Sequence, residues 1–355
     1  MAQLQVDRLS IRYGQYLAVD DVSFDVREGE FVSLLGPSGC GKTTTLRCIA
    51  GLETASSGRI AIGGQRVADG SWEVPPNKRG VNMVFQSYAV WPHMTVFENV
   101  AYGLRSQRVP TAELTRRVRD TLEMVGLGAF EKRYGTELSG GQQQRLAVAR
   151  AVVTSPRLLL FDEPLSNLDA GLRERMRVEL TELQRRLGRT SVYVTHDQAE
   201  AMAMSDRVIL MRNGRIVQQG TPRDLYETPN CRFAAEFVGN ANLLPGVLDG
   251  PGRIRVGDLR LNAATPASGD ADLLVCIRPE NVQIAGEAGG ENVFAAQVER
   301  VGYLGNSLSC EISAGGLRLR ADLPAHSRMQ QGASIHLRVD PANITLVPEV
   351  AEAAI

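Results

Sequence analysis

One short segment limits most strongly what this chain can fold into. Residues 36–43 read Gly-Pro-Ser-Gly-Cys-Gly-Lys-Thr and match the pattern G-x-x-x-x-G-K-[ST]. The apolar run Phe31–Leu35 comes directly before this segment, and a helical stretch that ends near Gly51 follows it. A glycine-rich turn between a strand and a helix exposes backbone N–H groups at a helix N-terminus, where an anion is favoured. The segment therefore predicts an α/β fold with a phosphate site at the end of this strand.

The composition singles out the lysine of this segment. The chain has 39 basic residues, of which only three are lysine, at positions 42, 78 and 132. A compact ammonium at Lys42 fits between phosphates inside a closed loop, where a planar guanidinium would be too bulky. The Thr43 hydroxyl is a predicted ligand of Mg²⁺. The residues expected to contact a nucleotide here are Gly36, Ser38, Gly39, Cys40, Gly41, Lys42, Thr43 and Thr44.

Three further apolar runs end, like the first, at a polar residue. Runs of about five apolar, often β-branched residues that alternate with helical patterns predict buried and largely parallel strands. Ligands of such sheets bind at the carboxyl ends of the strands, so the four ends predict one shared site. The runs are Phe31–Leu35, Val81–Phe85, Leu158–Phe161 and Ser191–Thr195, and they are followed by Gly36, Gln86, Asp162 and His196.

The pair Asp162 and Glu163 supplies the acidic half of a phosphate site. Asp162 is predicted to hold Mg²⁺, directly or through water, and Glu163 to orient an attacking water as general base. A strand that ends in Asp-Glu is weak evidence alone, because acidic residues often follow strands. Together with the loop at Lys42, the pair predicts nucleotide hydrolysis.

The segment Leu138–Gln142, Leu-Ser-Gly-Gly-Gln, predicts a helix start that is open to an anion. Ser139 followed by Gln142 at the third position has the form of a capping box, and the two glycines between them, Gly140 and Gly141, leave the first N–H groups bare. An ordinary capped helix would explain the cap, but not its occurrence beside the other segments. Ser139, Gly140, Gly141 and Gln142 are therefore candidate nucleotide-binding residues.

The chain changes character near residue 240. Residues 241–355 contain nine Arg, no Lys and 13 acidic residues, and segments such as Leu317–Arg320 and Ile335–Val339 alternate apolar and polar residues. This alternation predicts a second, all-β domain of small-barrel type. The domain is acidic and has few aromatic residues, and the whole chain has a net charge of −1, so nucleic-acid binding is disfavoured.

Earlier in the chain, two local patterns predict single elements. Leu172, Met176, Leu180, Leu183 and Leu187 have the spacing of an amphipathic helix, and Asn213-Gly214 is typical of a hairpin turn. Five scattered cysteines form neither a disulfide framework nor a zinc pattern, and no apolar run approaches the roughly 18 residues of a membrane span. We expect a cytoplasmic protein without a membrane span.

Taken together, these segments resemble the ATP-binding cassette (ABC) family, specifically the ATPase subunits of bacterial importers, from Tyr13 to the last strands of the barrel. The resemblance implies ATP and Mg²⁺ as cofactors. It also implies two domains. Residues 1–240 would form an ATPase domain with a helical subdomain at about 87–155, and residues 241–355 would form a regulatory or dimerisation domain of OB-like (TOBE) type. It further implies that Gln86 senses metal and γ-phosphate, that Asp169 belongs to a D-loop, that His196 is a switch histidine and that Tyr13 stacks on adenine.

The resemblance also implies partners. In the family two ATPase subunits close head to tail, so that Ser139–Gln142 of one completes the phosphate site of the other. The expected assembly is a homodimer at the cytoplasmic face of the inner membrane, with two transmembrane permease subunits and an extracytoplasmic solute-binding protein. Segments 87–93 and 237–245 resemble polyamine and ferric-iron importers. Leu165–Ala170 is at least as common in the sugar-type subgroup, so a sugar or glycerol-phosphate importer is the alternative.

Other classes of protein fit the sequence less well. A soluble ABC ATPase of DNA maintenance or translation is disfavoured for three reasons. Lys42 and Asp162 are only 120 positions apart, which is too short for a long coiled coil between them. The chain also has one cassette and no excess of basic residues. A GTP switch is disfavoured because Gly80 stands where N-K-x-D requires Asp. A pure binding module would lack Glu163 and His196.

Overall fold

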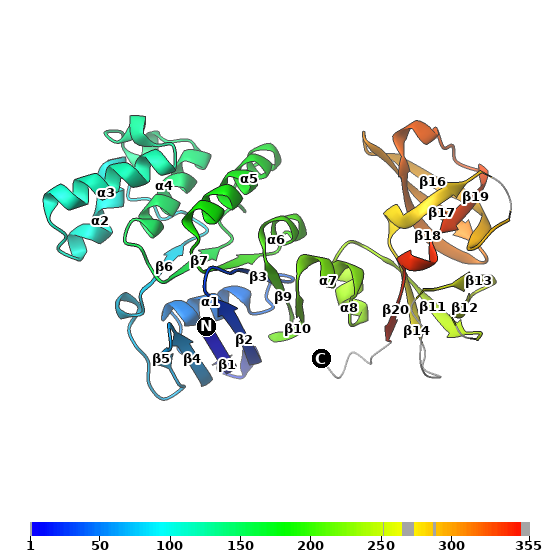
Figure 1. Cartoon of the computed structure of the whole chain (residues 1–355), viewed down its shortest axis with the longest axis horizontal. Coiled ribbons are helices and arrows are strands. Elements are labelled where there is room, and N and C mark those ends of the chain that lie inside the picture. Colours follow the sequence, from blue (N-terminus) through cyan, green and yellow to red (C-terminus); the bar gives the residue numbers. More distant parts are fainter. Residues whose placement is uncertain (1, 251, 265–272, 287–288, 349–355) are drawn as a thin grey trace. The chain divides into compact units, whose positions relative to one another are not determined.

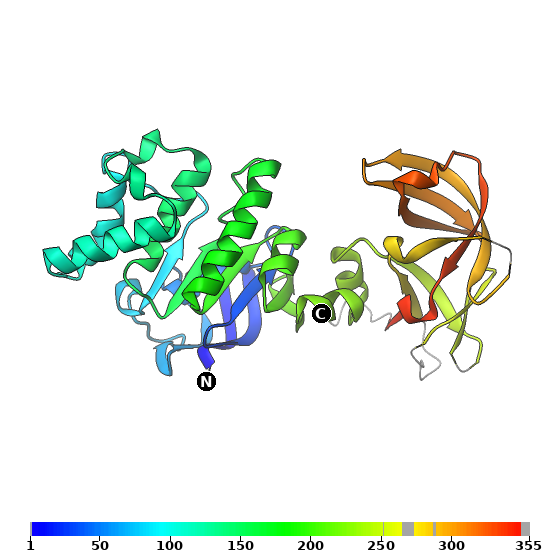
Figure 2. The same ribbon diagram turned by 45° about the horizontal axis from the view of Figure 1, so that its top comes forward.

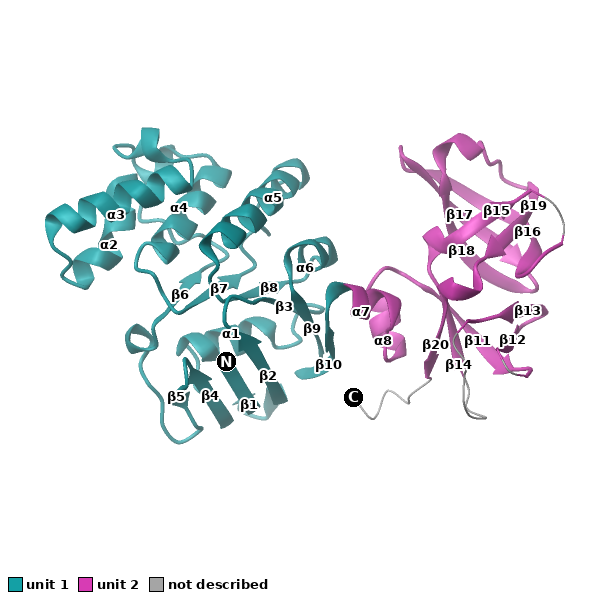
Figure 3. Cartoon of the chain, viewed as in Figure 1, with its two compact units in different colours: residues 1–222 teal, residues 223–355 magenta. Residues whose placement is uncertain are grey.

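The computed structural model describes residues 2–250, 252–264, 273–286 and 289–348. The chain divides into two units, residues 1–222 and residues 223–355, which Figure 3 shows in different colours. Each has a hydrophobic core of its own and is described by itself. Across the described ranges, every helix is too short or too polar to cross a membrane.

A six-stranded sheet forms the centre of the first unit (Figure 1). Its strands are β3 (Phe31–Leu35), β6 (Val81–Val84), β7 (Leu158–Asp162), β8 (Ser191–Thr195), β9 (Arg207–Arg212) and β10 (Arg215–Gly220). They lie in the order β10-β9-β3-β8-β7-β6, all parallel except the hairpin β9–β10. The predicted parallel strands are confirmed, and so is the turn at Asn213 and Gly214, whose φ angles of 51° and 81° suit a tight hairpin.

A second, antiparallel sheet was not predicted from the sequence. Its strands are β1 (Ala2–Tyr13), β2 (Tyr16–Arg27), β4 (Ser57–Ile62) and β5 (Gln65–Ala68), in the order β2-β1-β4-β5. Helix α1 (Lys42–Ala50) packs between the two sheets, because Leu46 and Ile49 share one buried cluster with residues of both. The helix that carries the phosphate-type loop is thus fixed on two sides.

The central sheet buries both of its faces, as its nearly continuous apolar strands predict. Val32 and Leu34 belong to the core around α1, whereas Phe31 of the same strand joins Phe161 and Tyr193 on the other face. The second face is covered by helices α4 (Gly140–Val152) and α5 (Ala170–Leu187), and α6 (Gln198–Met204) lies beside them. The predicted amphipathic helix is confirmed as α5, which buries Met176 and Leu180.

A helical segment lies beyond the edge strand β6, and Figure 2 shows its helices grouped together. It consists of α2 (Val96–Ser106), α3 (Thr111–Met124) and α4, which share a core around Val100, Val118 and Leu146. Thr95 begins α2 with a capping box to Glu98.

The second unit is mostly β-structure, as predicted. It contains α7 (Pro222–Glu227), α8 (Arg232–Phe237), β11 (Asn242–Leu248), β12 (Arg253–Val256), β13 (Leu259–Asn262), β14 (Leu273–Ile277), β15 (Val282–Ala285), β16 (Val293–Tyr303), β17 (Ser307–Ala314), β18 (Leu317–Pro324), β19 (Ser334–Val339) and β20 (Ile344–Pro348). The strands form two five-stranded antiparallel sheets, β13-β12-β11-β14-β20 and β15-β19-β16-β17-β18, around one core.

The two units meet at residues 222 and 223, ahead of the compositional change near residue 240. Helix α8 accounts for the difference, because its Ala235 packs in one buried cluster with Leu274, Cys276 and Val347 of the β-structure. Residues 265–272 and 349–355 of the predicted second domain lie outside the described residues.

Candidate functional site

The loop between β3 and α1 needs glycine at two positions because other backbone lies against it. A Cβ atom at Gly36 would lie 2.2 Å from the carbonyl oxygen of Met211, and one at Gly41 would lie 2.5 Å from that of Ala18. Gly41 also has a φ of 98° and is the N-cap of α1. Any side chain here would force the loop away from the strands behind it.

Lys42 lies inside this loop with almost no exposed surface. Its side chain is buried, and its Nζ donates to the carbonyl oxygens of Gly36 at 2.8 Å and Pro37 at 3.0 Å. No carboxylate among the described residues pairs with it. The ammonium is held by its own loop, including a contact with Cys40 Sγ at 3.8 Å, and the Asp162 carboxylate interacts with it electrostatically without forming an ion pair. It remains available to an anionic ligand.

Thr43 and Asp162 come together from α1 and the end of β7. The Thr43 hydroxyl donates to Asp162 Oδ1 at 2.9 Å, and Arg47 Nη2 lies 3.7 Å from Asp162 Oδ2. Burial raises the pKa of Asp162, and the hydrogen bond from Thr43 opposes that shift. The two predicted metal-ligating groups thus lie side by side. Arg47, which the sequence analysis missed, stands on α1 one turn after Thr43 and carries no sequence signal of its own.

Glu163 and His196 meet at the ends of the adjacent strands β7 and β8. Oε2 of Glu163 lies 3.1 Å from Nδ1 of His196. Glu163 has a φ of 44°, the left-handed region that non-glycine residues rarely occupy, and its N–H donates to the carbonyl of Val194. The strained backbone turns the carboxylate toward His196, whose side chain is half exposed.

A buried carboxylate behind His196 was not identified from the sequence. Glu200 on α6 is 3 % exposed, and its Oε2 accepts from the Tyr193 hydroxyl at 2.8 Å and the Thr195 hydroxyl at 2.7 Å. Burial raises its pKa. Asp197 is the N-cap of α6, and Glu200 follows it with the spacing of a capping box, which is a sequence signal for this pair. The Glu200 carboxylate bonds to Tyr193 and Thr195 of the sheet rather than to the backbone of the cap.

Gln86 and Asp169 both contact or belong to the segment 166–169, which leads into α5. The Gln86 carbonyl accepts from Asn167 Nδ2 at 2.8 Å, while its exposed side chain makes no hydrogen bond within the described ranges. Asp169 is the N-cap of α5, and its Oδ1 accepts from the Leu172 N–H at 2.9 Å. The segment 166–169 is therefore tied both to the end of β6 and to the start of α5.

Ser139 begins α4 through the predicted capping box, which is confirmed. The Ser139 N–H donates to Gln142 Oε1 at 3.0 Å, and the Gln142 N–H donates to Ser139 Oγ at 3.5 Å. A Cβ at Gly140 would lie 3.5 Å from Leu168, an ordinary contact, so packing within this chain does not by itself require glycine there. Among the described residues, no hydrogen bond or ion pair joins this helix start to the loop at Lys42.

The remaining predicted residues surround the loop. Tyr13 is the last residue of β1, and 47 % of its surface is exposed. Its pKa is raised mainly by partial burial and less by a hydrogen bond with Glu53, and a hydrogen bond with Thr44 opposes the shift. Ser38 and Gly39 are exposed at the tip of the loop. Cys40 is buried, and burial raises the pKa of its thiol, consistent with a packing role.

The assembled groups can bind an anion, hold a hard divalent cation and remove a proton from water. Lys42 and the α1 N-terminus supply positive charge, Thr43 and Asp162 supply oxygen ligands, and Glu163 supplies a base within hydrogen-bond distance of His196. This combination is the chemistry of phosphoanhydride hydrolysis.

Comparison with known proteins agrees with this chemistry. Residues 19–166 match the ABC transporter family, and residues 275–347 match the TOBE domain. The spermidine/putrescine import ATP-binding protein PotA of Rubrobacter xylanophilus is 49 % identical over 86 % of this chain and 81 % of its own length. The Fe(3+) ions import ATP-binding protein FbpC of Brucella abortus is 50 % identical over 86 % of each chain.

A solved structure shows the same fold in the first unit. It is cbiO1 from Clostridium perfringens, part of the ABC transporter complex cbiONQ, and it is 27 % identical with a TM-score of 0.57. The likeness covers 63 % of this chain and 90 % of that one. The chain therefore belongs to the ABC transporter family, as an ATP-hydrolysing subunit of the bacterial importer type with a C-terminal TOBE domain.

Proposed function

We propose that ATP binds with its phosphates in the loop at Gly36–Thr44 and its adenine on Tyr13. The buried ammonium of Lys42 supports the phosphate position, because among the described residues its hydrogen bonds go to its own loop and it forms no ion pair. The half-exposed ring of Tyr13 lies beside α1, to which Thr44 belongs, and supports the adenine position. Ser38, Gly39, Cys40 and Gly41 offer backbone N–H groups to the phosphates.

Thr43, Asp162 and Gln86 fit a site for Mg²⁺. The Thr43 hydroxyl and Asp162 carboxylate already touch, and all three side chains offer oxygen ligands, which Mg²⁺ prefers. When bound, Mg²⁺ neutralises charge on the transferred phosphoryl group. Burial raises the pKa of Asp162. A cation bound beside it would oppose that shift, because a positive charge favours the ionised carboxylate.

Glu163 acts as general base, and its 3.1 Å contact with His196 is the observation that carries this part of the proposal. The carboxylate takes a proton from the attacking water as the water oxygen bonds to the γ-phosphorus and the bond to ADP breaks. His196 holds the Glu163 carboxylate in position through this contact. Glu200 fixes Tyr193 and Thr195, which carry His196 at the end of β8.

Two chains form the complete site by packing head to tail. The capped N-terminus of α4 at Ser139, Gly140, Gly141 and Gln142 favours an anion, and no hydrogen bond or ion pair ties it to the loop of its own chain across the described residues. Its natural partner is the ATP held by a second copy, with Asp169 nearby in the interface.

Mixing two inactive variants tests this dimer. Lys42→Ala removes the ammonium, and Gly140→Asp places a carboxylate at the α4 N-terminus. In a head-to-tail heterodimer of these variants, one site carries both defects and the other carries none, so mixing restores part of the ATPase rate. Mixtures that stay as inactive as each variant alone contradict the arrangement.

The helical segment carries a groove that suits the permease subunits. Trp91, Tyr102 and Arg150 line this groove; the Trp91 and Tyr102 rings form a tilted pair with 4.5 Å between centroids, and the Arg150 guanidinium lies 3.8 Å above the Trp91 ring. Burial lowers the pKa of Arg150 to about 10. Aromatic and arginine side chains at a groove are typical of interface anchors. The assembly would be two such ATPase chains at the cytoplasmic face of the membrane, with two permease subunits and an extracytoplasmic solute-binding protein.

The transported solute is a polyamine or ferric iron. The spermidine/putrescine and Fe(3+) importers that this chain matches at about half identity support that class over sugar transport. Uptake of radiolabelled spermidine and of ⁵⁵Fe(III) into cells, with and without the gene, distinguishes the two. Loss of maltose or glycerol-phosphate uptake alone would contradict both.

The domain assignment is also a proposal. Residues 1–240 form the ATPase domain, with the helical subdomain at about 87–155, and residues 241–355 form a regulatory or dimerisation domain. The separate cores of the two units support a division into two domains, while the structural boundary at residues 222 and 223 groups α8 with the second.

A further inference from the structure

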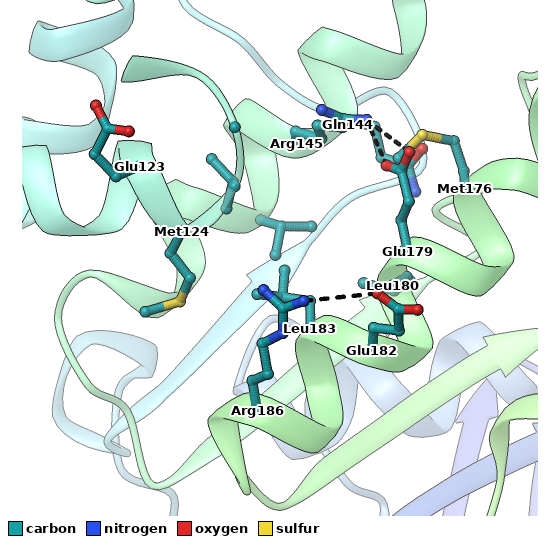
Figure 4. Close-up of a pocket in the computed structure, with 13 residues that line it drawn as sticks. Glu123, Met124, Gln144, Arg145, Met176, Glu179, Leu180, Glu182, Leu183 and Arg186 are labelled. Atoms are coloured by element: carbon teal, nitrogen blue, oxygen red, sulfur yellow. Dashed lines mark hydrogen bonds and ion pairs between the residues drawn. The ribbon is translucent and has the colours of Figure 1, made fainter.

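A cleft of about 260 Å³ lies between the helical segment and α5 (Figure 4). Its walls come from the end of α3, from α4 and from the middle of α5. None of its lining residues belongs to the ATP site.

Gln144 on α4 brings an unpartnered carboxamide to this cleft. The residue is 1 % exposed, and within the part of the chain that the structure describes neither its Oε1 nor its Nε2 has a hydrogen-bond partner. Buried polar groups are almost always paired, because an unpaired one costs much of its hydration free energy. Both atoms have almost no accessible surface, so an occupant of the cleft reaches this acceptor and donor when the Gln144 side chain turns toward it.

The rest of the wall is mainly apolar and adaptable. Met124 and Met176 face it together with Val148, Leu180 and Leu183. Methionine adjusts to irregular shapes and makes favourable sulfur contacts with aromatic rings. The volume lies just below the roughly 300–1,000 Å³ of typical drug-sized sites, so a one- or two-ring molecule fits better than a lipid chain.

Four of the five charged residues that line the cleft form two ion pairs, while the fifth, Glu123, has no ion pair among the described residues. Arg145 Nη2 lies 2.6 Å from Glu179 Oε2, and Arg186 Nη2 lies 3.7 Å from Glu182 Oε2, and Figure 4 shows both pairs. Neither arginine is left to attract an anion. An uncharged occupant therefore fits better than a phosphate or carboxylate.

We propose that the cleft binds a small, uncharged aromatic molecule whose edge carries an adjacent N–H donor and carbonyl acceptor, as in a lactam or a nucleobase. The edge pairs with the Gln144 carboxamide, and the ring lies between Met124 and Met176. Because α4 begins at Ser139 and α5 begins after Asp169, an occupant would alter ATP turnover. That consequence rests on the proposed function, whereas the binding itself does not.

A pair of probe compounds tests the site on the full chain. 2-Quinolone carries the adjacent donor and acceptor, and N-methyl-2-quinolone has the same ring without the donor. Calorimetry is expected to show that 2-quinolone binds at least about fivefold more tightly, the effect of one hydrogen bond. Equal affinity for the two compounds, or no binding of either, overturns the proposal.

Two variants locate the binding. Gln144→Met keeps the side-chain size but removes both polar atoms, so it should abolish the preference for 2-quinolone. Gln184→Met is the matched control, because Gln184 on α5 is also buried with an unpartnered Nε2 but does not line the cleft. A preference that survives Gln144→Met, or that disappears in Gln184→Met, contradicts the site.

If Gln144→Met does not fold, Leu183→Phe, which fills the cleft, should weaken the binding of both compounds. Unchanged affinities would then overturn the proposal. Loss of ATPase activity by itself does not affect this binding test.

Discussion

Oε2 of Glu163 and Nδ1 of His196 are 3.1 Å apart, although the two residues stand at the ends of different strands. Strands β7 and β8 are parallel neighbours, so their carboxyl ends bring the two side chains to one edge of the sheet. The left-handed backbone of Glu163 completes the approach. A base and the group that positions it are thus built into the scaffold before any ligand arrives.

Glu163→Gln should abolish ATP turnover while leaving ATP binding intact. The amide keeps the size of the side chain but cannot accept a proton from water, so the phosphate-release rate should fall by at least about 100-fold. ATP should then hold the variant as a dimer, which size-exclusion chromatography with and without ATP detects. Glu174→Gln, an exposed change on α5, is the control. Turnover of Glu163→Gln at the wild-type rate would remove Glu163 from its assigned role.

His196→Ala should also reduce hydrolysis strongly, by about 100-fold or more, because the Glu163 carboxylate loses the group that orients it. The His196 side chain is half exposed, so its removal should change the free energy of unfolding little. Steady-state ATPase rates and urea unfolding curves measured on one preparation separate the two effects. A stable variant with an unchanged rate would make His196 structural only.

Asp162→Asn should weaken the dependence of activity on Mg²⁺. The amide oxygen can still accept the Thr43 hydrogen bond, but the site loses a negative charge. We expect the Mg²⁺ concentration for half-maximal ATPase activity to rise at least tenfold, while EDTA abolishes activity in wild type. Asp120→Asn, exposed on α3, should leave the Mg²⁺ requirement unchanged. An identical Mg²⁺ titration for Asp162→Asn would argue against metal binding there.

The sequence predicts the site well because its residues follow uninterrupted buried strands. Each of β3, β7 and β8 is fully buried, so a continuous apolar run marks the strand and the next residue marks its end. Parallel pairing then requires that those ends meet. The contact of Thr43 with Asp162 also needs the loop, because β8 lies between β3 and β7 and Thr43 stands in the first turn of α1.

The N-terminal antiparallel sheet could not be found in the same way. In β1 the buried residues Leu4 and Val6 alternate, but the register shifts before Leu9 and Ile11. Arg8 has a φ of 48° at that shift, and the extra residue changes which face the following side chains occupy. A period of two is then lost over the whole strand.

Glu200 was missed for a different reason, since a polar residue in the first turn of a helix ordinarily faces solvent or caps it.

Glu200 predicts a specific dependence of stability on pH. Burial raises its pKa in the folded chain, so its contribution to stability is present below the ordinary carboxyl pKa and is lost as pH rises through the folded value. Glu200→Gln keeps an acceptor for Tyr193 and Thr195 but cannot ionise. The variant should therefore gain stability relative to wild type as pH rises over that window, measured as the difference in unfolding free energy. Taking this difference cancels the similar contribution of Asp162, which is present in both proteins. A difference that stays constant with pH, or that changes in the opposite direction, would contradict a buried, titrating Glu200.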